Sequence, residues 1–290
     1  MRCLQGELTV ERMCRLAEVS RASYYRVQRK RAPVDTDMEV RSKIQTICLS
    51  HRRYGYRRVG RELAKAGPVV NHKKVLRLMR QDNLLAIRKR KFVATTDRNH
   101  DRPIFGNYAR HISPDGPNQL WVADITYIRL RWEFVYLAVV LDVFSRRVVG
   151  WALSRSLQVG LAVTALEAAL ANRQPPPGLV HHSDRGIQYA SKQYVEMLER
   201  AKILGSMSRP GNPYDNAFCE SFMKTLKQEE VYCTHYTGLE DLQAHLGEFI
   251  EEYYNRRRLH SALGYCTPVS YELQHARSTA AGAGGLDSPL

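Results

Sequence analysis

The sequence predicts a two-part chain, in which an all-α helix-turn-helix region precedes an α/β domain with a mixed five-stranded sheet and flanking helices. Three observations lead to this prediction. The chain has 290 residues and a hydrophobic content of 44%, enough for more than one core. Residues 1–110 show helical periodicity and contain 27 Lys and Arg against 10 Asp and Glu. Residues 111–290 contain strand-like apolar runs that first follow one another closely and then alternate with helices.

The first 36 residues are expected to form a helix-turn-helix-like segment. One helix is expected over Val10 to Ala17. A second is expected from Ser20 to Arg26, because a serine side chain can accept a hydrogen bond from a free amide at a helix start. Pro33 interrupts the pattern. This segment by itself is only a weak indication of DNA binding.

Residues 37–92 are predicted to form a second helix-turn-helix domain that binds DNA. Helices are expected over Met38 to His51, up to about Ala66, and over His72 to Gln81 behind a capping Asn71. The last helix has an apolar face and a basic face, as a recognition helix requires, although an ordinary solvated amphipathic helix would look similar. The residues of the basic face that we expect to contact DNA are Lys73, Lys74, Arg77 and Arg80.

Residues 111–275 are predicted to form the α/β domain, between a basic linker at 93–110 and a disordered tail at 276–290. Short connections between the first three strands predict an antiparallel meander. The expected strands are Leu120 to Leu130, Phe134 to Phe144, Arg147 to Ser154, Leu179 to Ser183 and Ile203 to Ser208. The expected helices are Val159 to Asn172, Lys192 to Ala201, Asn216 to Val231 and Leu239 to Asn255.

The positive charge is concentrated in the first part of the chain. Of a total net charge of +15, residues 1–110 have a net charge of +17, whereas residues 111–290 contain 17 Lys and Arg against 19 Asp and Glu. Such an excess favours a polyanionic partner, because each neutralised phosphate releases counterions. The six cysteines form no CxxC pair, and no apolar run approaches the roughly 18 residues of a membrane span. We therefore expect a soluble cytoplasmic protein that binds double-stranded DNA and no membrane.

Three acidic residues lie in apolar stretches, where an acid is costly. Asp124 falls inside a predicted strand, Asp184 ends another, and Glu220 lies in an apolar stretch of a predicted helix. A carboxylate in such a setting is paired, protonated or bound to a cation. Oxygen ligands suit Mg²⁺ or Mn²⁺, and two such ions about 4 Å apart can promote chemistry at a phosphodiester. Taken singly, however, each acid is better explained as a local salt bridge, a turn or a solvated helix position.

The spacing of the three acids carries a resemblance to a known family. There are 59 residues between Asp124 and Asp184, and 35 between Asp184 and Glu220. With its surroundings, this pattern resembles the D,D(35)E signature of insertion-sequence transposases of the IS-three family, relatives of the retroviral integrases. The resemblance covers about residues 1–272. Its matching stretches are Tyr54 to Arg58, Trp121 to Ile128, His182 to Tyr189, Asn212 to Ala217, and the set Tyr254, Asn255, Arg258, His260, Leu263 to Tyr265, Thr267 and Pro268.

The resemblance implies a fold, a reaction and partners. It implies an RNase H-like core in which Asp124, Asp184 and Glu220 are the catalytic carboxylates and hold two Mg²⁺ ions, with Mn²⁺ as the alternative. It also implies terminal inverted repeats and target DNA as substrates, a homo-oligomer on DNA, and an upstream-frame partner protein or fusion. The expected reaction is DNA strand cleavage followed by strand transfer, with no covalent protein intermediate. Retroviral integrases have an N-terminal zinc module whose spacing is missing here, so helix-turn-helix units are expected to replace it.

For several further residues, a functional role and a structural role are both possible on the sequence. Lys227 lies two helical turns after Glu220 and is expected to contact DNA phosphate, with Lys224 as a weaker candidate. Gly186 is either a turn glycine or a point of close approach beside Asp184. Structural roles are favoured for Asp215 and Asn216 as helix caps, for Asp142, and for His181 and His182 as hydrogen-bonding core residues. The run Arg256 to Arg258 is either solvated or a phosphate clamp.

Three other functions are compatible with parts of the sequence. An RNase H-type nuclease that only hydrolyses DNA would not need the basic helical region. A DNA-binding regulator with an inactive catalytic fold would not need the intact set of three acids. A scaffolding protein would explain neither feature.

Overall fold

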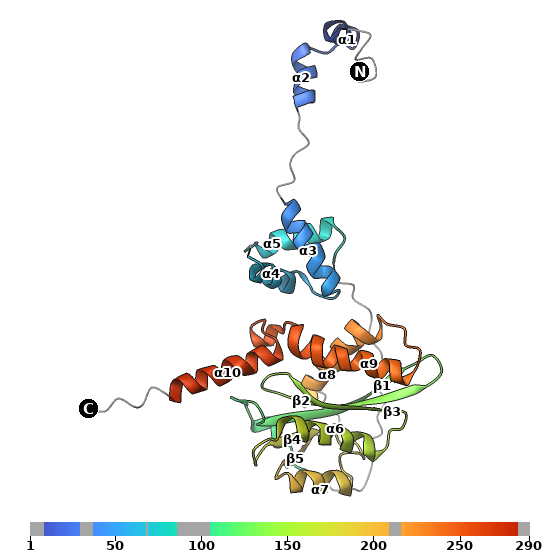
Figure 1. Cartoon of the computed structure of the whole chain (residues 1–290), viewed down its shortest axis with the longest axis vertical. Helices are drawn as coiled ribbons and strands as arrows, with labels where there is room; N and C mark the ends of the chain where they lie inside the picture. The colour runs from blue at the N-terminus through green and yellow to red at the C-terminus, as the bar shows by residue number, and fades with distance from the viewer. Residues whose placement is uncertain (1–8, 30–36, 68, 86–104, 209–215, 284–290) are drawn as a thin grey trace, which may run out of the picture. The chain divides into compact units, whose positions relative to one another are not determined.

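The computed structural model describes residues 9–29, 37–67, 69–85, 105–208 and 216–283 (Figure 1). The chain divides into two compact units, Met1–Ala86 and Ile87–Leu290. We refer to the second as the sheet unit.

The N-terminal unit contains the predicted helices. Helix α1 spans Val10–Leu16 and begins at Thr9, whose side chain accepts a hydrogen bond from the Arg12 amide. Helix α2 spans Arg21–Arg29. Ser20 caps it as expected, because its Oγ accepts a hydrogen bond of 3.0 Å from the Ser23 amide.

Helices α3 (Met38–Ser50), α4 (Tyr56–Lys65) and α5 (His72–Gln81) pack together around a small apolar core. The prediction for α5 is confirmed in full. It spans His72–Gln81, the Asn71 side chain accepts a hydrogen bond of 2.8 Å from the Lys73 amide, and its apolar face is buried. The buried core residues of these helices and their connections are Ile44, Tyr54, Val59, Leu63, Val75, Leu78 and Met79.

The sheet unit is built on the predicted mixed five-stranded sheet, with strand order β3-β2-β1-β4-β5. The first three strands form the expected antiparallel meander, whereas β4 pairs parallel to β1 and β5 parallel to β4. Strand β1 is central, and it pairs with β4 only from Leu120 to Val122. The strand bounds are β1 Leu120–Arg129, β2 Phe134–Asp142, β3 Val148–Ser154, β4 Val180–Ser183 and β5 Leu204–Met207.

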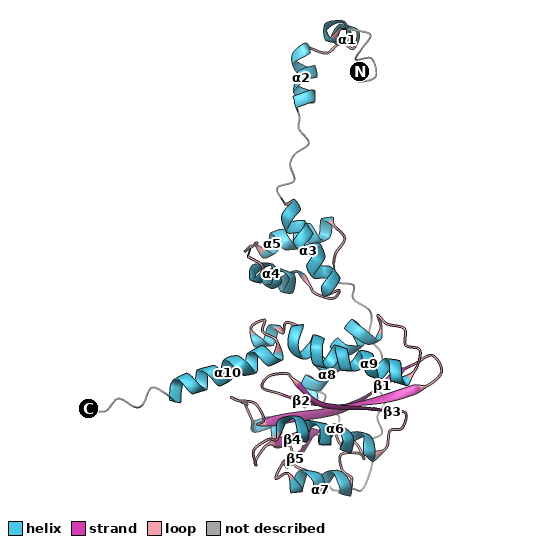
Figure 2. Cartoon of the chain, in the orientation of Figure 1, coloured by secondary structure: helices cyan, strands magenta, loops and turns pink. Residues whose placement is uncertain are grey.

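Helices cover both faces of the sheet (Figure 2). Helices α6 (Val159–Arg173) and α7 (Lys192–Arg200) share one core with the odd-numbered β1 residues Trp121 and Ala123. On the other face, α8 (Ala217–Leu226) and α9 (Leu239–Gly247) share a core with Val122 and Ile128. Both of these helices continue as π-helical turns, η4 (Lys227–Val231) and η5 (Glu248–Arg257). The alternation along β1 therefore separates the two cores.

Gly150 lets α6 approach β3 closely. A Cβ at this position would lie 2.3 Å from the Ala165 carbonyl oxygen and 2.6 Å from the Ala169 amide nitrogen. Both contacts are with helix backbone, which cannot move aside without shifting α6.

A Gly150→Ala variant is expected to lose about 3 kcal/mol or more of unfolding free energy, because overpacking against backbone has no local relief. Urea unfolding of the full chain would measure the loss. Gly160→Ala on α6 is the control, since a Cβ there meets nothing within 4 Å. Equal stability of the two variants would contradict close packing at Gly150.

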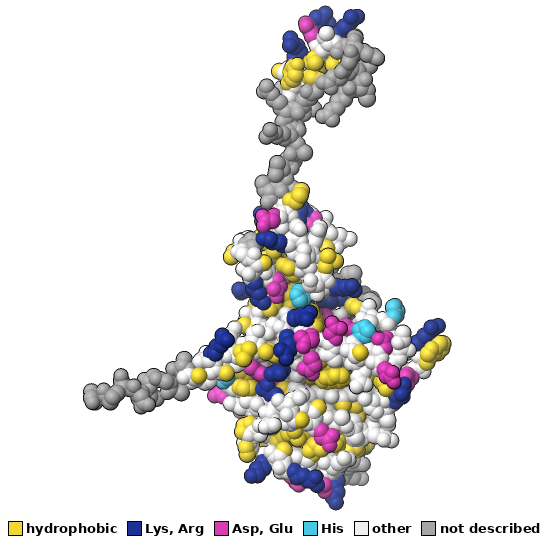
Figure 3. All heavy atoms as spheres, in the orientation of Figure 1, with side chains coloured by type: hydrophobic (Ala, Val, Ile, Leu, Met, Phe, Trp, Pro, Cys, Tyr) yellow, Lys and Arg dark blue, Asp and Glu magenta, His cyan; other side chains and the backbone are white. Residues whose placement is uncertain are grey.

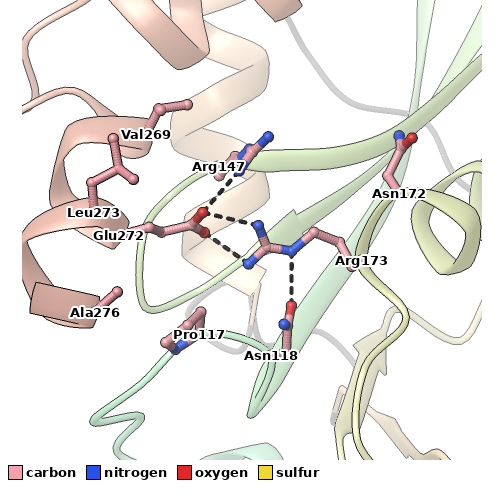
Figure 4. A pocket seen from close by; sticks show the side chains of 9 residues that line it. All are labelled: Pro117, Asn118, Arg147, Asn172, Arg173, Val269, Glu272, Leu273 and Ala276. Carbon is pink, nitrogen blue, oxygen red and sulfur yellow. Dashed lines mark hydrogen bonds and ion pairs between the residues drawn. The ribbon is translucent and has the colours of Figure 1, made fainter. Parts of the chain in front are cut away.

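The C-terminal segment corrects one prediction. Residues 276–290 were expected to be disordered, but helix α10 spans Pro268–Ala283. Glu272 anchors it, because its carboxylate accepts hydrogen bonds of 2.9 Å from Arg173 and Arg147 (Figure 4). It also accepts one of 2.7 Å from the Ser145 hydroxyl. These partners lie far from Glu272 in the sequence, so local composition gave no sign of the anchored helix.

The predicted linker, residues 93–110, also extends too far toward the C-terminus. Residues 105–110 pack on the sheet unit, where the Ser206 hydroxyl accepts hydrogen bonds of 3.0 and 3.2 Å from the Tyr108 and Ala109 amides. Ala109 begins a short 3-10 helix, η2 (Ala109–His111), and Phe105 packs against the apolar core below β5. The preceding residues, 86–104, lie outside the described part of the chain.

The C-terminal part of η5 has a structural role. The Asn255 side chain exchanges two hydrogen bonds of 3.0 Å with the backbone of Val148, next to the irregularity in the β2–β3 pairing. Tyr254 packs edge-on against Phe222 and His260, with ring centroids 4.8 Å apart in each case. These contacts fasten the C-terminal helices to the sheet and to α8.

No helix among the described residues is long and apolar enough to cross a membrane.

Candidate active site

The three predicted carboxylates come from three elements that meet beside the centre of the sheet. Asp124 lies on β1, two residues beyond Val122, where the pairing with β4 ends. Asp184 directly follows β4, and Glu220 lies in the first turn of α8. Because β1 and β4 are parallel neighbours and α8 packs on β1, these positions come close together in space.

The two aspartates are oriented by backbone amides. Asp124 Oδ1 accepts a hydrogen bond of 2.9 Å from the Ile125 amide, and Asp184 Oδ1 accepts one of 2.9 Å from the Gly186 amide. A Cβ at Gly186 would lie 2.9 Å from this same Asp184 oxygen. Gly186 therefore lets the Asp184 carboxylate approach the backbone closely.

The electrostatics of Asp124 depend on the other two acids. Burial and the charge of Asp184, together with the charge of Glu220, raise the pKa of Asp124 to about 7, against the effect of the Ile125 amide hydrogen bond and the Lys227 charge. A buried carboxylate whose pKa is raised by neighbouring carboxylate charges lies where a cation would be stabilised. Asp184 and Glu220 are therefore near enough to Asp124 for their charges to act on it.

The three carboxylates are only partly arranged for binding a metal ion. Among the described residues, no three His, Cys, Asp or Glu side chains are close enough together to hold a metal ion. Glu220 is exposed, whereas Asp124 and Asp184 are half-buried. The donor set fits a hard divalent cation, since it consists of carboxylate oxygens, but the three side chains would have to come closer together to share it.

Lys227 lies at the end of α8, as the heptad spacing from Glu220 predicts. Its Nζ is 4.9 Å from the centre of the Tyr127 ring, and the charge of Asp124 acts on it. Burial lowers the pKa of Lys227, and Asp124 opposes that shift. Lys224, the second candidate, is exposed.

Asn216 is a residue of this site whose role the sequence did not reveal. It was expected to cap α8, but its side chain makes no capping hydrogen bond. Instead, Asn216 Nδ2 donates a hydrogen bond of 3.1 Å to the carbonyl oxygen of Ala123, the neighbour of Asp124. Its Oδ1 is buried without a hydrogen-bond partner among the described atoms. Asp215, the other expected cap, lies outside the described residues.

Two further buried groups lie in the electrostatic surroundings of Asp124 and Asp184. Burial raises the pKa of the Tyr189 hydroxyl and of the Cys219 thiol, and both aspartates add to each shift. Tyr189 belongs to the matching stretch His182 to Tyr189, and Cys219 precedes Glu220. Their position inside apolar segments resembles that of any core residue, so only the fold identifies them.

Asp142 and the histidines have the structural roles that were favoured for them. Asp142 is fully buried at the end of β2 and accepts hydrogen bonds of 2.7 and 3.2 Å from the Asn118 and Ser145 amides. The nitrogens of His182 lie 2.9 and 3.0 Å from the hydroxyls of Ser206 and Ser208.

His181 is buried in the core under α7, where its Nε2 lies 3.0 Å from the Tyr194 hydroxyl. Burial, with the neighbouring His182 as a smaller cause, lowers the pKa of His181 from 6.5 to about 4. The unfolded chain therefore binds more protons between these two pH values. Stability from the neutral imidazole is complete above pH 6.5 and falls as the pH drops toward 4.

We expect this histidine to contribute a loss of about 2 kcal/mol in unfolding free energy between pH 7.5 and pH 5. Urea unfolding at the two pH values would measure it. A His181→Gln variant can still accept from Tyr194 and has no proton to gain, so its loss over the same interval should be smaller by that amount. An equal pH dependence would contradict the low pKa.

The run Arg256 to Arg258 is, over its whole length, neither a solvated charge run nor a phosphate clamp. Arg258 is buried and forms a two-armed ion pair with Glu229, at 2.8 and 3.0 Å. Arg256 is exposed and pairs with Glu252 at 3.5 Å. Arg258 is therefore neither solvated nor available to a phosphate.

The predicted DNA-contact residues of α5 differ in their surroundings. Asp37 lies 2.6 Å from Lys74 Nζ and 2.9 Å from Arg77 Nη2. The hydrogen bond from Lys74, with the charges of both cations, lowers the pKa of Asp37. Lys73 and Arg80 are exposed, on the same side of the helix two turns apart.

Family comparisons agree with this architecture. An HTH-like domain model matches residues 35–92, and two Integrase core domain models match residues 114–213 and 201–268. The chain is 37% identical over 273 residues to the insertion element IS600 uncharacterized 31 kDa protein of Shigella sonnei, covering 92% of this chain and 100% of that protein. It is also 37% identical over 274 residues to transposase InsF for insertion sequence IS3A of Escherichia coli (strain K12), covering 92% and 95% of the two chains.

One structural comparison is weaker. A chain of the simian T-cell lymphotropic virus intasome matches with a TM-score of 0.47 and 18% sequence identity, and the match covers 79% of this chain and 74% of that one. The sequence relatives confirm the resemblance on which the expectations were based. The chain belongs to the IS3 family of insertion-sequence transposases, and its C-terminal unit is an integrase core domain.

Proposed function

We propose that this transposase binds the terminal inverted repeats of a mobile element and catalyses divalent-metal-dependent DNA strand cleavage and strand transfer. The observation that supports this most strongly is the convergence of Asp124, Asp184 and Glu220 from β1, the end of β4 and the first turn of α8, where the charges of Asp184 and Glu220 help raise the pKa of Asp124 to about 7. Three like charges that converge beside β1 are unfavourable alone and favourable around a cation.

Asp124, Asp184 and Glu220 are the residues that would hold Mg²⁺, or Mn²⁺, with two ions expected. When bound, such ions supply Lewis-acid stabilisation of charge on the attacking and leaving oxygens of a phosphodiester. Other residues of the chain orient the carboxylates. The amides of Ile125 and Gly186 fix the aspartates, and Asn216 holds the β1 backbone beside Asp124.

Lys227 is proposed to contact the DNA phosphate next to the carboxylates. It is half-buried and close enough to Asp124 for their charges to interact, so a phosphate drawn toward the cations would meet its ammonium group. The missing side chain at Gly186 lets the Asp184 carboxylate lie against the backbone amide that orients it.

The helix-turn-helix domain is proposed to hold the DNA. Lys73 and Arg80 are exposed on α5. Lys74 and Arg77 form ion pairs with Asp37, so to contact a phosphate they must break these pairs or bind Asp37 and the phosphate together. The sheet unit has a mixed surface, in which basic and acidic side chains lie next to each other over the C-terminal helices (Figure 3). This division agrees with the net charge of +17 in residues 1–110. A homo-oligomer on DNA and an upstream-frame partner or fusion remain part of the proposal.

A strand-transfer assay separates this function from simple hydrolysis. The purified full chain would be incubated with Mg²⁺, a labelled DNA carrying the ends of the element from either side of its gene, and an unlabelled target plasmid. Label joined to the plasmid supports a transposase. Cut DNA without joined product would support the hydrolysis-only alternative, and no reaction would support the inactive DNA-binding alternative.

Glu220→Gln provides the test of the third carboxylate in the same assay, and Glu167→Gln provides its control. Glu167 is also an exposed helical glutamate, but it lies on α6, on the opposite face of the sheet. Loss of product in Glu220→Gln alone is expected. Equal activity of the two variants would contradict the role of Glu220.

A further inference from the structure

The turn between β1 and β2 exposes aromatic side chains to an unusual degree. A hydrogen bond of 2.9 Å from the Leu130 amide to the Glu133 carbonyl closes this hairpin. Trp132 at its tip is 85% exposed, Phe134 50% and Tyr127 37%. Large apolar side chains in a group on the surface indicate a binding site more often than a single exposed residue does.

Each of these aromatic rings has a cation beside it. The Arg131 guanidinium carbon is 4.8 Å from the centre of the Trp132 ring, and that of Arg129 is 5.9 Å from Phe134. Tyr127 packs edge-on against Phe134 at 5.8 Å. We call the group Tyr127, Arg129, Arg131, Trp132 and Phe134 the hairpin-tip surface.

The net charge of the hairpin-tip surface is positive. The acid within this stretch of the chain, Glu133, pairs with Arg155 at 2.8 Å and therefore does not neutralise Arg129 or Arg131. Alternating arginines and exposed aromatic rings suit a ligand that has both negative charges and flat apolar faces. A nucleic acid strand with unpaired bases has both, because its phosphates meet the arginines and its bases stack on the rings.

Lys227 links the hairpin-tip surface to the carboxylate site. The alternation along β1 places Tyr127 on the opposite face of the strand from Asp124, but Lys227, whose charge interacts with Asp124, lies 4.9 Å from the Tyr127 ring. At roughly 3.3 Å per strand residue, the tip lies about 20 to 25 Å from Asp124.

We propose that the hairpin-tip surface binds unpaired bases of the DNA strand, about 20 to 25 Å from the phosphodiester that is cut. This inference rests on the proposed function, because the position of the cut strand is taken from the carboxylate site. Duplex DNA fits less well, since its paired bases do not offer their faces to Trp132.

Tryptophan fluorescence provides a direct test without any cleavage. The chain has three tryptophans, all in the sheet unit. Trp121 is fully buried, and Trp151 is half-buried with its indole nitrogen 3.3 Å from Glu251. Stacking of a base on Trp132 should quench its emission, and the difference between the wild-type chain and Trp132→Phe isolates that signal.

The full chain would be titrated, without divalent cations, with a single-stranded oligo-dT of 20 nucleotides, a 20-base-pair duplex and heparin. We expect oligo-dT to quench the wild-type chain by up to about a third and Trp132→Phe hardly at all. An Arg131→Ala/Trp132→Ala variant should bind oligo-dT about tenfold more weakly, because loss of one stacked base typically weakens binding by about 5- to 150-fold. Lys192→Ala, an exposed charge change on α7, should bind like the wild-type chain.

Several results would overturn the inference. These are equal quenching in the wild-type chain and Trp132→Phe, quenching by duplex or heparin as strong as that by oligo-dT, or a blue shift of Trp132 with protein concentration alone, which would indicate a second copy of the chain. Failure here is distinguishable from failure of the proposed function. Strand transfer can persist while the fluorescence test fails, and base stacking can be observed in a chain that does not cut DNA.

Discussion

An Asp124→Asn variant is expected to lose DNA strand cleavage by a factor on the order of 10³ or more while it binds DNA as well as the wild-type chain. Loss of groups that merely orient a metal ligand already costs about 10- to 100-fold, so loss of a direct ligand should cost more. DNA binding should persist because the exposed cations of α5 belong to the other compact unit. Gel-based cleavage assays and binding titrations on the same preparation would measure both quantities.

The same variant has a second, independent readout. Asp124 is crowded by Asp184 and Glu220, so removal of its charge relieves repulsion in the metal-free protein. The variant should therefore melt at the same temperature as the wild-type chain or higher without metal. Added Mg²⁺ or Mn²⁺ should raise the melting temperature of the wild-type chain, since a ligand that binds only the folded state stabilises it, and should have little effect on the variant.

Asp115→Asn is the matched control, because Asp115 is exposed and its oxygen accepts a hydrogen bond from the Gln119 side chain that an asparagine can also accept. It should cut DNA and respond to Mg²⁺ like the wild-type chain. Cleavage by Asp124→Asn in Mg²⁺ at more than a tenth of the wild-type rate would contradict the assignment of the site.

An Arg258→Leu variant is expected to lose about 3 to 5 kcal/mol of stability, because it leaves the buried Glu229 carboxylate without its partner. The side chains of Arg258 and Glu229 are 6% and 8% exposed, so water cannot replace the lost charge. In a unit of this size the loss corresponds to a fall of about 10 °C in melting temperature. Calorimetry of the full chain would record it in the transition of the sheet unit.

Arg256→Leu is the control for this prediction. Arg256 lies two residues earlier, and its ion pair with Glu252 is more than half exposed on both sides. Such pairs contribute only about 0 to 1 kcal/mol. A Glu229→Gln/Arg258→Leu double variant should recover part of the stability, since the unpaired charge is removed. Equal losses for the two single arginine variants would contradict the difference in burial.

Arg258 also links stability to the candidate site. Its partner Glu229 lies on η4, the direct continuation of α8, and also accepts a hydrogen bond of 3.0 Å from the Tyr253 hydroxyl. The ion pair therefore fastens the end of the helix that carries Glu220 and Lys227. Part of the resemblance to the transposase family around residues 254–268 thus serves to hold α8, rather than to contact DNA.

The sequence determined the order and class of the elements, because each depends on local patterns. Alternation of apolar residues identified β1, β2 and β3, and the short connections between them dictated the antiparallel meander. The 3.6-residue period and a capping asparagine located α5 at both ends. The spacing of Asp124, Asp184 and Glu220 with the surrounding motifs identified the family, which the relatives at 37% identity confirm.

Only the tertiary structure decided what the polar residues contact. Asn216 looked like a helix cap but holds the backbone beside Asp124, and Arg258 looked like part of a charged surface but is buried against Glu229. Helix α10 could not be recognised from its Ala- and Gly-rich end, because Glu272 is anchored by arginines about 100 residues earlier or more. Local patterns fix elements through neighbours in the chain, whereas the role of a charge depends on its burial and partners, which come from distant segments.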